Sequence, residues 1–464
     1  MMVRSGVSRW TMAHFALSLV ALVLAQLLFV FGYSDLQSGL RAPATLIGVH
    51  LTTIGWLSLL MLGALYQFAP VITNTRLYSQ RLPLYALVSI VAGLGAMVLG
   101  FLALAGSAGL AVGWLPVGGA LVLAGFALGA ADLWITLWPV RPLPLAAVFV
   151  VCSLAFLLLT GLIGLGFALT FALPQPSAFL GRLTGAGLEL HLAAGLGGWF
   201  TLTMMGVSYR LLTMFMLAPD APRRTTYAAL VLSVSGLLLL IAVQVAGIWT
   251  GVDVAAGAVV AAVLIAAGVA CYLADIVRFY RTRARRHLEL NSVTAGAALA
   301  LFALALVAGL AAAALGVFGR FAGTIVYLFV FGGLTGLGLS QLYKIIPFLT
   351  WLEKFGPKLG KGPVLRVQDL VNERRARPWF VLYFVTVLLA SGCLAFGQTT
   401  GWRVAAGLQL VATLLIVAEL WRSRHPDPNL EPKPMQVPGL PARPVARGGP
   451  AGLERPTPTP RSTT

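Results

Sequence analysis

The apolar residues of this chain gather in runs long enough to cross a lipid bilayer as helices. A hydrocarbon core about 30 Å thick requires roughly 20 apolar residues in an α-helix. Runs of this kind lie at residues 11–32, 46–69, 82–105, 114–137, 144–173, 187–213, 226–249, 254–279, 292–317, 321–346, 378–397 and 401–421. The pattern therefore predicts an all-α polytopic membrane protein, with twelve transmembrane helices making one domain over residues 1–421.

Basic residues are concentrated in alternate connections between these runs. One set carries Arg76 and Arg81, Arg141, Arg223 and Arg224, the arginines of 278–286, and the basic residues of 354–377, whereas the other carries only Arg41, Arg182, Arg320 and Arg403. Lys and Arg near membrane helices are retained on the cytoplasmic side during insertion. The asymmetry predicts that the basic connections and both termini are cytoplasmic.

Composition agrees with a membrane domain and accounts for the charge. Hydrophobic residues make up 59% of the chain and charged residues 10%, against about 25% charged residues in soluble domains. The net charge of +18 follows from positive loops beside a lipid bilayer and calls for no nucleic-acid partner. The connection after Pro347 mixes apolar and basic residues, so we expect it to lie on the membrane face or to contact a partner.

The C-terminal segment differs from the rest of the chain. Residues 422–464 are rich in Pro and Arg and contain few large apolar side chains. Such a segment cannot bury enough surface to offset the entropy of folding. We predict a disordered cytoplasmic tail.

The membrane domain contains an internal repeat. The segment GWLSLLMLGALY at 55–66 recurs as GWFTLTMMGVSY at 198–209, and the same offset separates Asp132 from Asp275. A fainter copy, GGLTGLGLSQLYKIIP at 332–347, aligns Tyr343 with Tyr66 and Pro347 with Pro70 by one further common offset. Repeats of four helices enter the membrane in the same direction, so they are parallel and related by an axis along the membrane normal. We predict three such units, at about 1–140, 141–285 and 286–421, with helices two, six and ten equivalent.

Three segments carry a resemblance to a known family. HLTTIGWLSLLMLGALYQFAP, HLAAGLGGWFTLTMMGVSYRLLTMF and QLYKIIPFLTW, together with the twelve-helix, three-unit pattern, resemble subunit I of the haem-copper oxidases and its small bacterial relatives. The resemblance covers nearly all of residues 1–421. It implies a multi-pass protein of the bacterial inner (plasma) membrane, with respiratory-complex or redox subunits as partners.

The histidine content departs from that family. Its members hold two haems and a copper ion with six imidazoles, on helices two, six, seven and ten. This chain has five histidines, of which His287 and His425 lie in basic loop or tail sequence, and helices seven and ten contain none. The chain is therefore not expected to be competent as a haem-copper oxygen reductase by itself.

Two histidines match the family by location. His50 and His191 lie near the outer ends of helices two and six, and Tyr327 takes the place of His50 in the third unit. Each histidine is either a packing or hydrogen-bonding residue near the interface, or a ligand to one haem b or to copper. Glu189 either orients the His191 imidazole without itself binding the ligand, or is a solvated acid at the membrane interface. His14 lies at the opposite depth, and the sequence leaves its role open.

Acidic residues close the fourth helix of each unit. Asp132, Asp275 and Glu419 stand near the cytoplasmic ends of helices four, eight and twelve. Carboxylates in such positions are paired with neighbouring cations or hydrogen-bond donors. We predict a structural role in which they pair with the basic loops.

Three functions fit these observations. The first is a non-catalytic or single-haem relative of cytochrome c oxidase subunit I that serves membrane electron transfer, redox or gas sensing, or support of a respiratory complex. The second is a cofactor-free membrane transporter or copper or haem assembly factor on the same scaffold, and the third is a purely structural subunit. Visible absorbance and metal analysis distinguish them.

Overall fold

The computed structural model describes residues 6–36, 39–220, 222–360 and 363–427, and these residues form helices and connections without strands. Among these described residues, twelve helices or continuous helix runs are long and apolar enough to cross a membrane. Nine are single helices: α1 (Gly6–Val30), α4 (Leu82–Leu104), α5 (Trp114–Leu137), α6 (Leu145–Ala172), α10 (Arg224–Thr250), α11 (Ala255–Thr282), α12 (Leu290–Ala314), α15 (Glu373–Ala395) and α16 (Thr399–Arg424). By the length and apolar composition of these helices, the protein is a multi-pass membrane protein.

The remaining three spans change their helix type part-way. Span two consists of α2 (Pro43–His50), η1 (Leu51–Ser58) and α3 (Leu59–Thr73); span six of α8 (Leu188–Leu192), η2 (Ala193–Thr201) and α9 (Leu202–Met216); span ten of α13 (Phe318–Tyr327), η3 (Leu328–Thr335) and α14 (Gly336–Lys354). In all three the middle segment is a π-helix.

Every predicted apolar run overlaps one of these spans, but many ends differ, and the run 292–317, for example, extends past the end of α12 at Ala314. The longest extension is in span ten, where the helix continues from residue 346 to Lys354. The prediction omitted α7 (Ala178–Ala186), a short helix capped by Ser177. Helix α16 continues to Arg424, past the predicted boundary at 421, and the predicted tail from residue 428 onward lies outside the described residues.

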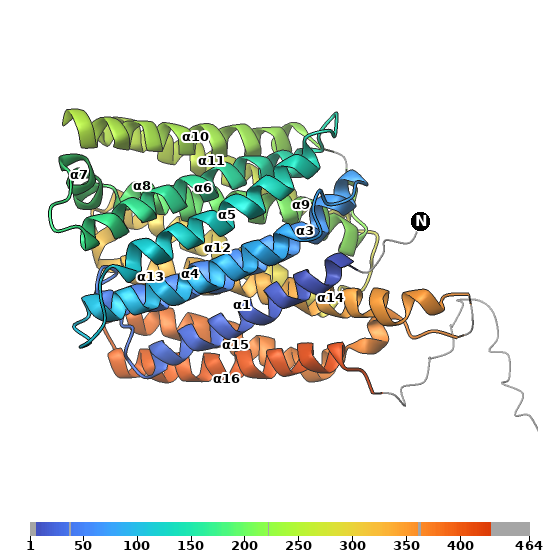
Figure 1. The fold of residues 1–464 in the computed structure, drawn as a ribbon. Coiled ribbons are helices and arrows are strands. Elements are labelled where there is room, and N and C mark those ends of the chain that lie inside the picture. Colours follow the sequence, from blue (N-terminus) through green and yellow to red (C-terminus); the bar gives the residue numbers. More distant parts are fainter. Residues whose placement is uncertain (1–5, 37–38, 221, 361–362, 428–464) are drawn as a thin grey trace, which may run out of the picture.

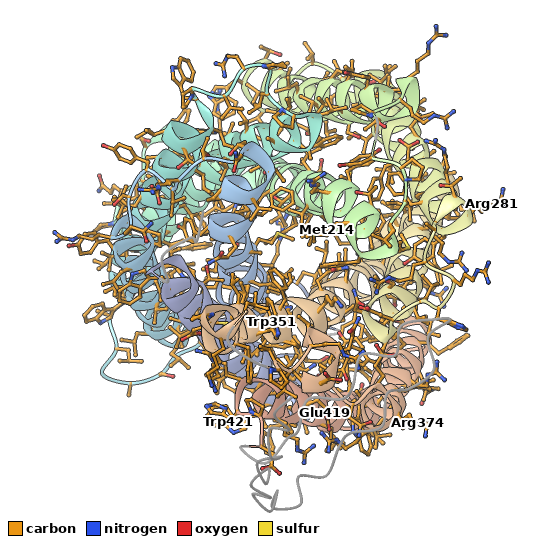
Figure 2. All side chains as sticks on the ribbon, turned by 90° about the vertical axis from the view of Figure 1, so that its right-hand side faces the viewer. Met214, Arg281, Trp351, Arg374, Glu419 and Trp421 are labelled. Atoms are coloured by element: carbon orange, nitrogen blue, oxygen red, sulfur yellow. The ribbon has the colours of Figure 1, made fainter. Side chains whose placement is uncertain are left out.

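The spans run side by side, with the start of α1 and the end of α14 at one end of the bundle and α7 at the other (Figure 1). We call the first end the basic face. It is formed by the connections at 74–81, 138–144, 217–223, 283–289 and 355–372, and Figure 2 views the bundle from this end. Within the last connection, the short 3-10 helices η4 (Gly356–Lys358) and η5 (Val367–Leu370) fold back on the bundle, where the Trp351 indole N–H donates to the Leu365 carbonyl.

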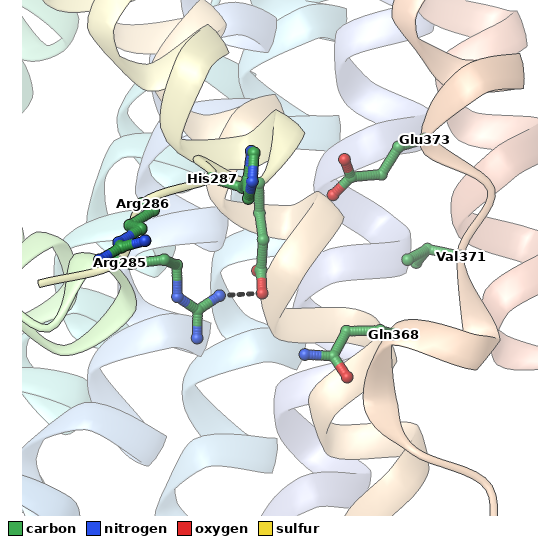
Figure 3. A pocket seen from close by; sticks show the side chains of 7 residues that line it. Arg285, Arg286, His287, Gln368, Val371 and Glu373 are labelled. Carbon is green, nitrogen blue, oxygen red and sulfur yellow. Dashed lines mark hydrogen bonds and ion pairs between the residues drawn. The ribbon is translucent and has the colours of Figure 1, made fainter. Parts of the chain in front are cut away.

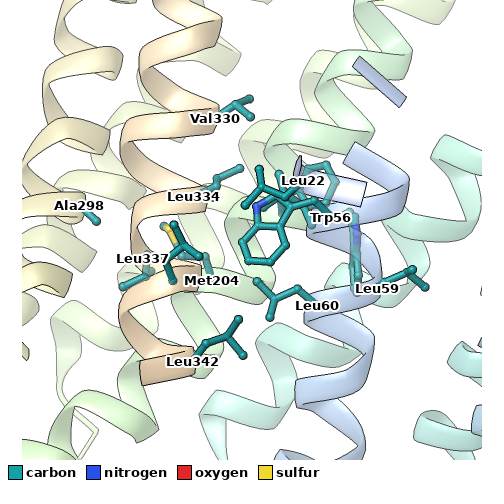
Figure 4. Packing of buried hydrophobic residues seen from close by; sticks show 14 of the residues in the cluster. Leu22, Trp56, Leu59, Leu60, Met204, Ala298, Val330, Leu334, Leu337 and Leu342 are labelled. Carbon is teal, nitrogen blue, oxygen red and sulfur yellow. The ribbon is translucent and has the colours of Figure 1, made fainter. Parts of the chain in front are cut away.

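Spans two, six and ten form the centre of the bundle. Between 61% and 67% of their most apolar windows is buried, compared with 22% for α10 and α11. Trp56 of span two is fully buried, and its ring lies among Leu60, Leu334 and Met204 in the close-up of the core (Figure 4). Contacts between α3 and α9, and between Leu60 and Gly338, also join these three spans.

The π-helical segments have side-chain support as well as backbone bonds. In a π-helix the backbone bonds join residues five apart, and the Ser58 hydroxyl donates to the carbonyl of Thr53 over 2.8 Å. The Thr201 hydroxyl does the same to Leu196 over 2.7 Å in η2. The neighbouring helix lies close at this point, because a Cβ on Gly198 would be 2.3 Å from Cγ of Phe156 in α6.

The three acids predicted to close helices four, eight and twelve hold the starts of the preceding helices. Asp132 accepts from the backbone N–H of Ser79, just before α4, over 2.8 Å, and Asp275 accepts from the hydroxyls of Thr225 and Thr226 in α10. Glu419 pairs with Arg375 near the start of α15 over 2.7 and 2.8 Å. The prediction of basic partners is confirmed for Glu419. It is wrong for Asp132 and Asp275, because backbone and hydroxyl donors lie nearer to these carboxylates.

Candidate functional site

The predicted site residues lie at the same point of three spans, directly before or one residue from a π-helix. His50 is the last residue of α2, and Tyr327 is the last residue of α13. His191 is the penultimate residue of α8. The three side chains therefore lie where an α-helix changes to a wider π-helix. π-Helical segments within α-helices often occur at functional sites.

His50 is oriented by its own helix and by α4. Its Nδ1 lies 2.8 Å from the carbonyl of Leu46, so Nδ1 carries the proton, because a carbonyl only accepts. The ring packs against Phe101, with 5.1 Å between the ring centroids. The lone pair of this imidazole is thus on Nε2, the nitrogen that a metal would take.

His191 lies in a tight apolar setting beside α6. Its ring centroid is 5.5 Å from that of Phe167, and a Cβ on Gly164 would be 3.1 Å from its Cε1 atom. Its Nδ1 atom is buried and has no hydrogen-bond partner within the described part of the chain. His191 thus lies next to the α-to-π junction of span six, as His50 does in span two, with its ring against α6 whereas that of His50 is against α4.

Tyr327 is directed elsewhere. Its hydroxyl donates to Oε1 of Gln409 in α16, and its ring stacks on Phe331 at a centroid distance of 4.7 Å. The hydroxyl of Tyr383 in α15 donates to the Phe331 carbonyl over 2.8 Å. Tyr327 therefore belongs to a hydrogen-bonded group with α15 and α16.

Glu189 and His14 also have identified surroundings. Glu189 accepts a hydrogen bond from Nε2 of Gln244 in α10, which directs it toward α10. His14 is fully buried, with Nδ1 2.8 Å from the Trp10 carbonyl and its ring edge-on to Tyr66. Because Tyr66 follows η1 whereas His50 precedes it, His14 lies on the basic-face side of the π-helix and His50 on the other.

The ligand-binding capacity of the pair rests on two nitrogens. Nε2 of His50 is the ring nitrogen that does not face the Leu46 carbonyl, and Nδ1 of His191 is buried without a hydrogen-bond partner in the described part of the chain. Within that same part of the chain, no group of three or more His, Cys, Asp and Glu side chains is arranged to hold a metal ion. The donor set on offer is therefore two imidazoles, which suits axial ligation of a haem iron.

The sequence reasoning did not identify a second polar region, at the basic face. It lies where the connections 283–289 and 355–372 meet, and it includes a buried Asn291 and the ion pair between Lys344 and Glu289. The available signal was a polar Asn291 at the start of an otherwise apolar run.

No protein-family model and no curated protein sequence matches this chain.

Proposed function

We propose that this protein is a divergent relative of subunit I of the haem-copper oxidases that holds one haem at His50 and His191 and reduces no oxygen by itself. It serves membrane electron transfer, redox or gas sensing, or the support of a respiratory complex, in the inner membrane of a bacterium. The observation that carries the proposal is the placement of two imidazoles, one from span two and one from span six, at the junctions where these central spans change from α-helix to π-helix.

The proposed architecture is three parallel four-helix units, and the π-helices support it. The offset that aligns Tyr343 with Tyr66 also carries both ends of η1 onto the two ends of η3. The offset that aligns Asp275 with Asp132 carries the end of η1 onto the end of η2. In each proposed unit the first helix packs on the π-helix of the second: α1 on η1, α6 on η2 and α12 on η3.

Two hydrogen bonds between the central spans follow the same order. The indole N–H of Trp199 donates to Oγ of Ser58 over 3.1 Å, and that of Trp56 donates to Oγ1 of Thr335 over 3.0 Å. By the offsets of the repeat, Trp199 is the counterpart of Trp56, and Thr335 is the counterpart of Ser58. Equivalent donors and acceptors thus join the second unit to the first and the first to the third, as an axis relating the units requires.

The residues present fit a bis-imidazole haem. His50 would ligate through Nε2, since its Nδ1–H is held by the Leu46 carbonyl, and hydrogen bonding at the other ring nitrogen is the usual way in which proteins orient such a ligand. Phe101 and Phe167 restrict the two rings. A haem bound there would supply one-electron transfer or gas binding.

The proposal is tested by visible spectroscopy of protein purified from cells supplied with haem. We expect a Soret band that is lost in His50→Ala and in His191→Ala. It should persist in His287→Ala, a matched control whose histidine lies at the basic face, and it should change less in His14→Ala than in His50→Ala.

The other outcomes assign the competing functions. Copper without haem, lost on replacing either His50 or His191, would indicate a copper-delivering assembly factor. Protein that is folded but binds neither would refute the haem proposal and favour a cofactor-free scaffold.

A further inference from the structure

A pocket of about 500 Å³ opens at the basic face. One wall is the segment 285–289, which leads into α12, and the other is the segment 368–373, which leads into α15 (Figure 3). Pockets of this volume are typical of small-molecule sites. This one is remote from the histidine pair, so it does not depend on the proposed function.

A narrower extension continues from the pocket into the bundle. It shares Glu289, Gln368, Val371 and Glu373 with the outer pocket and has a volume of about 20 Å³, enough for one water molecule. Its own lining includes Asn291 at the start of α12 and Tyr343 of α14. The pocket thus has a wide charged mouth and a narrow polar end.

The narrow end contains polar groups without protein partners. Asn291 is 1% exposed, and neither its amide nitrogen nor its amide oxygen has a hydrogen-bond partner in the described part of the chain. The hydroxyl of Tyr343, a residue 4% exposed, is in the same state. Buried polar groups are nearly always hydrogen-bonded in folded proteins, so these groups indicate a ligand or a ligand-bound water.

The acids of the pocket are already engaged within the protein. Both oxygens of Glu289 are paired, one with Arg285 and the other with Lys344, and the Arg285 pair is drawn in Figure 3. One oxygen of Glu373 accepts from the backbone N–H of Leu290 over 3.0 Å. The two carboxylates therefore serve to hold cations and a helix start in place.

Positive charge remains for a ligand at the mouth. Arg286 is exposed and takes part in no ion pair found among the described residues. Arginine binds phosphate oxygens through paired N–H donors.

We propose that this pocket binds a phosphate group, carried either by a soluble anion or by the headgroup of an anionic lipid. Arg286 holds the phosphate at the mouth together with Arg285, and Asn291 and Tyr343 bind a polar group of the ligand or the water that accompanies it. A lipid source is compatible with the place of the site beside the ends of membrane spans, where basic pockets bind lipid headgroups.

The test measures thermal stabilisation of the full chain in phosphate-free maltoside micelles. Inorganic phosphate is one probe, and dioleoyl phosphatidylglycerol is the second, with dioleoylglycerol as its uncharged counterpart. A saturable shift with inorganic phosphate identifies a soluble anion, and a shift with phosphatidylglycerol alone identifies a lipid headgroup. No saturable shift with either probe overturns the proposal.

Two variants and one matched control assign the shift to this pocket. Arg286→Gln should weaken binding of the effective probe about tenfold, the loss expected for one charge-assisted contact. Asn291→Leu should weaken it while leaving the unliganded protein at least as stable, because the unpaired amide is gone. Arg281→Gln, which removes an exposed charge of α11 outside the pocket (Figure 2), should retain full affinity. An equal loss in Arg281→Gln would mean nonspecific attraction by the basic face and would refute the site.

Discussion

The hydrogen bond between spans six and two provides a quantitative test of the central packing. Trp199→Phe removes the indole N–H that donates to Ser58 over 3.1 Å but keeps an aromatic ring in the core. Ser58→Ala removes the acceptor. Donor and acceptor residues are 1% and 2% exposed, so water cannot replace the lost bond.

The expected coupling follows from what such bonds contribute in membranes. Hydrogen bonds between transmembrane helices give about 0.6 kcal/mol on average in double-mutant cycles and at most about 1.7 kcal/mol. Because this bond is fully buried, we expect a coupling energy of about 0.6–1.7 kcal/mol between Trp199→Phe and Ser58→Ala. The assay is unfolding in mixed maltoside and dodecyl sulfate micelles, followed by far-ultraviolet circular dichroism.

Two further cycles serve as comparison and control. Trp56→Phe with Thr335→Ala should give a coupling of the same size, because the bond has nearly the same length, 3.0 Å. Trp199→Phe with Thr386→Ala should be additive within about 0.5 kcal/mol, since Thr386 bonds within its own helix α15. Additivity in both tryptophan–hydroxyl cycles would show that these bonds do not join the spans and would remove support for equivalent units.

Three other predictions concern orientation, pH and close packing. A reporter fused after Arg286 should read cytoplasmic and one after Gln175 external; reversal of either would contradict the proposed orientation. Burial alone would raise the pKa of Glu289, but its hydrogen bonds and charges from Lys344 and Arg285 outweigh burial and hold the pKa below its ordinary value. The Glu289 carboxylate should therefore contribute fully to the free energy of unfolding above the ordinary glutamate pKa of about 4.3, and this contribution should be lost as pH falls through the lower folded-state pKa. Glu289→Gln should flatten the pH dependence of unfolding in this range. Gly198→Leu should destabilise the protein by about 1–3 kcal/mol through overpacking against Phe156, and an unchanged unfolding midpoint would contradict the close approach of α6.

The spans were predictable because the membrane imposes a length on them. Each predicted apolar run corresponds to one span, since about 20 residues are needed to cross the lipid with all backbone groups satisfied. Helix α7 was not predictable in this way, because it is too short to cross a bilayer and carries no length signal. Its one local signal was Ser177, whose side chain accepts from the Leu180 N–H as an N-cap.

The π-helices show that a sequence repeat does not by itself specify the helix type. A π-helix differs from an α-helix by a small change of winding, and residue propensities do not separate the two. The usable signal was the hydroxyl shared by Ser58, Thr201 and Thr335, of which the first two bond to the carbonyl five residues earlier. The sequence could assign His50 and His191 to equivalent helices. It could not identify their packing partners Phe101 and Phe167, because these depend on how neighbouring helices are placed.

The third proposed unit departs from the other two in three places that are linked by packing. Gly333 is its counterpart of Trp56, and a Cβ there would lie 3.0 Å from Cβ of Phe302, so α12 approaches η3 too closely for an indole. The third indole-to-hydroxyl bond is therefore missing, and the Thr201 hydroxyl bonds within its own π-helix. In the same unit Tyr327 replaces histidine and bonds to Gln409, while the start of α12 carries the unpaired Asn291. The third proposed unit therefore has neither the indole donor nor the imidazole of its counterparts, and the pocket proposed for phosphate lies where its first helix α12 begins, with Arg285 of the second proposed unit at the mouth.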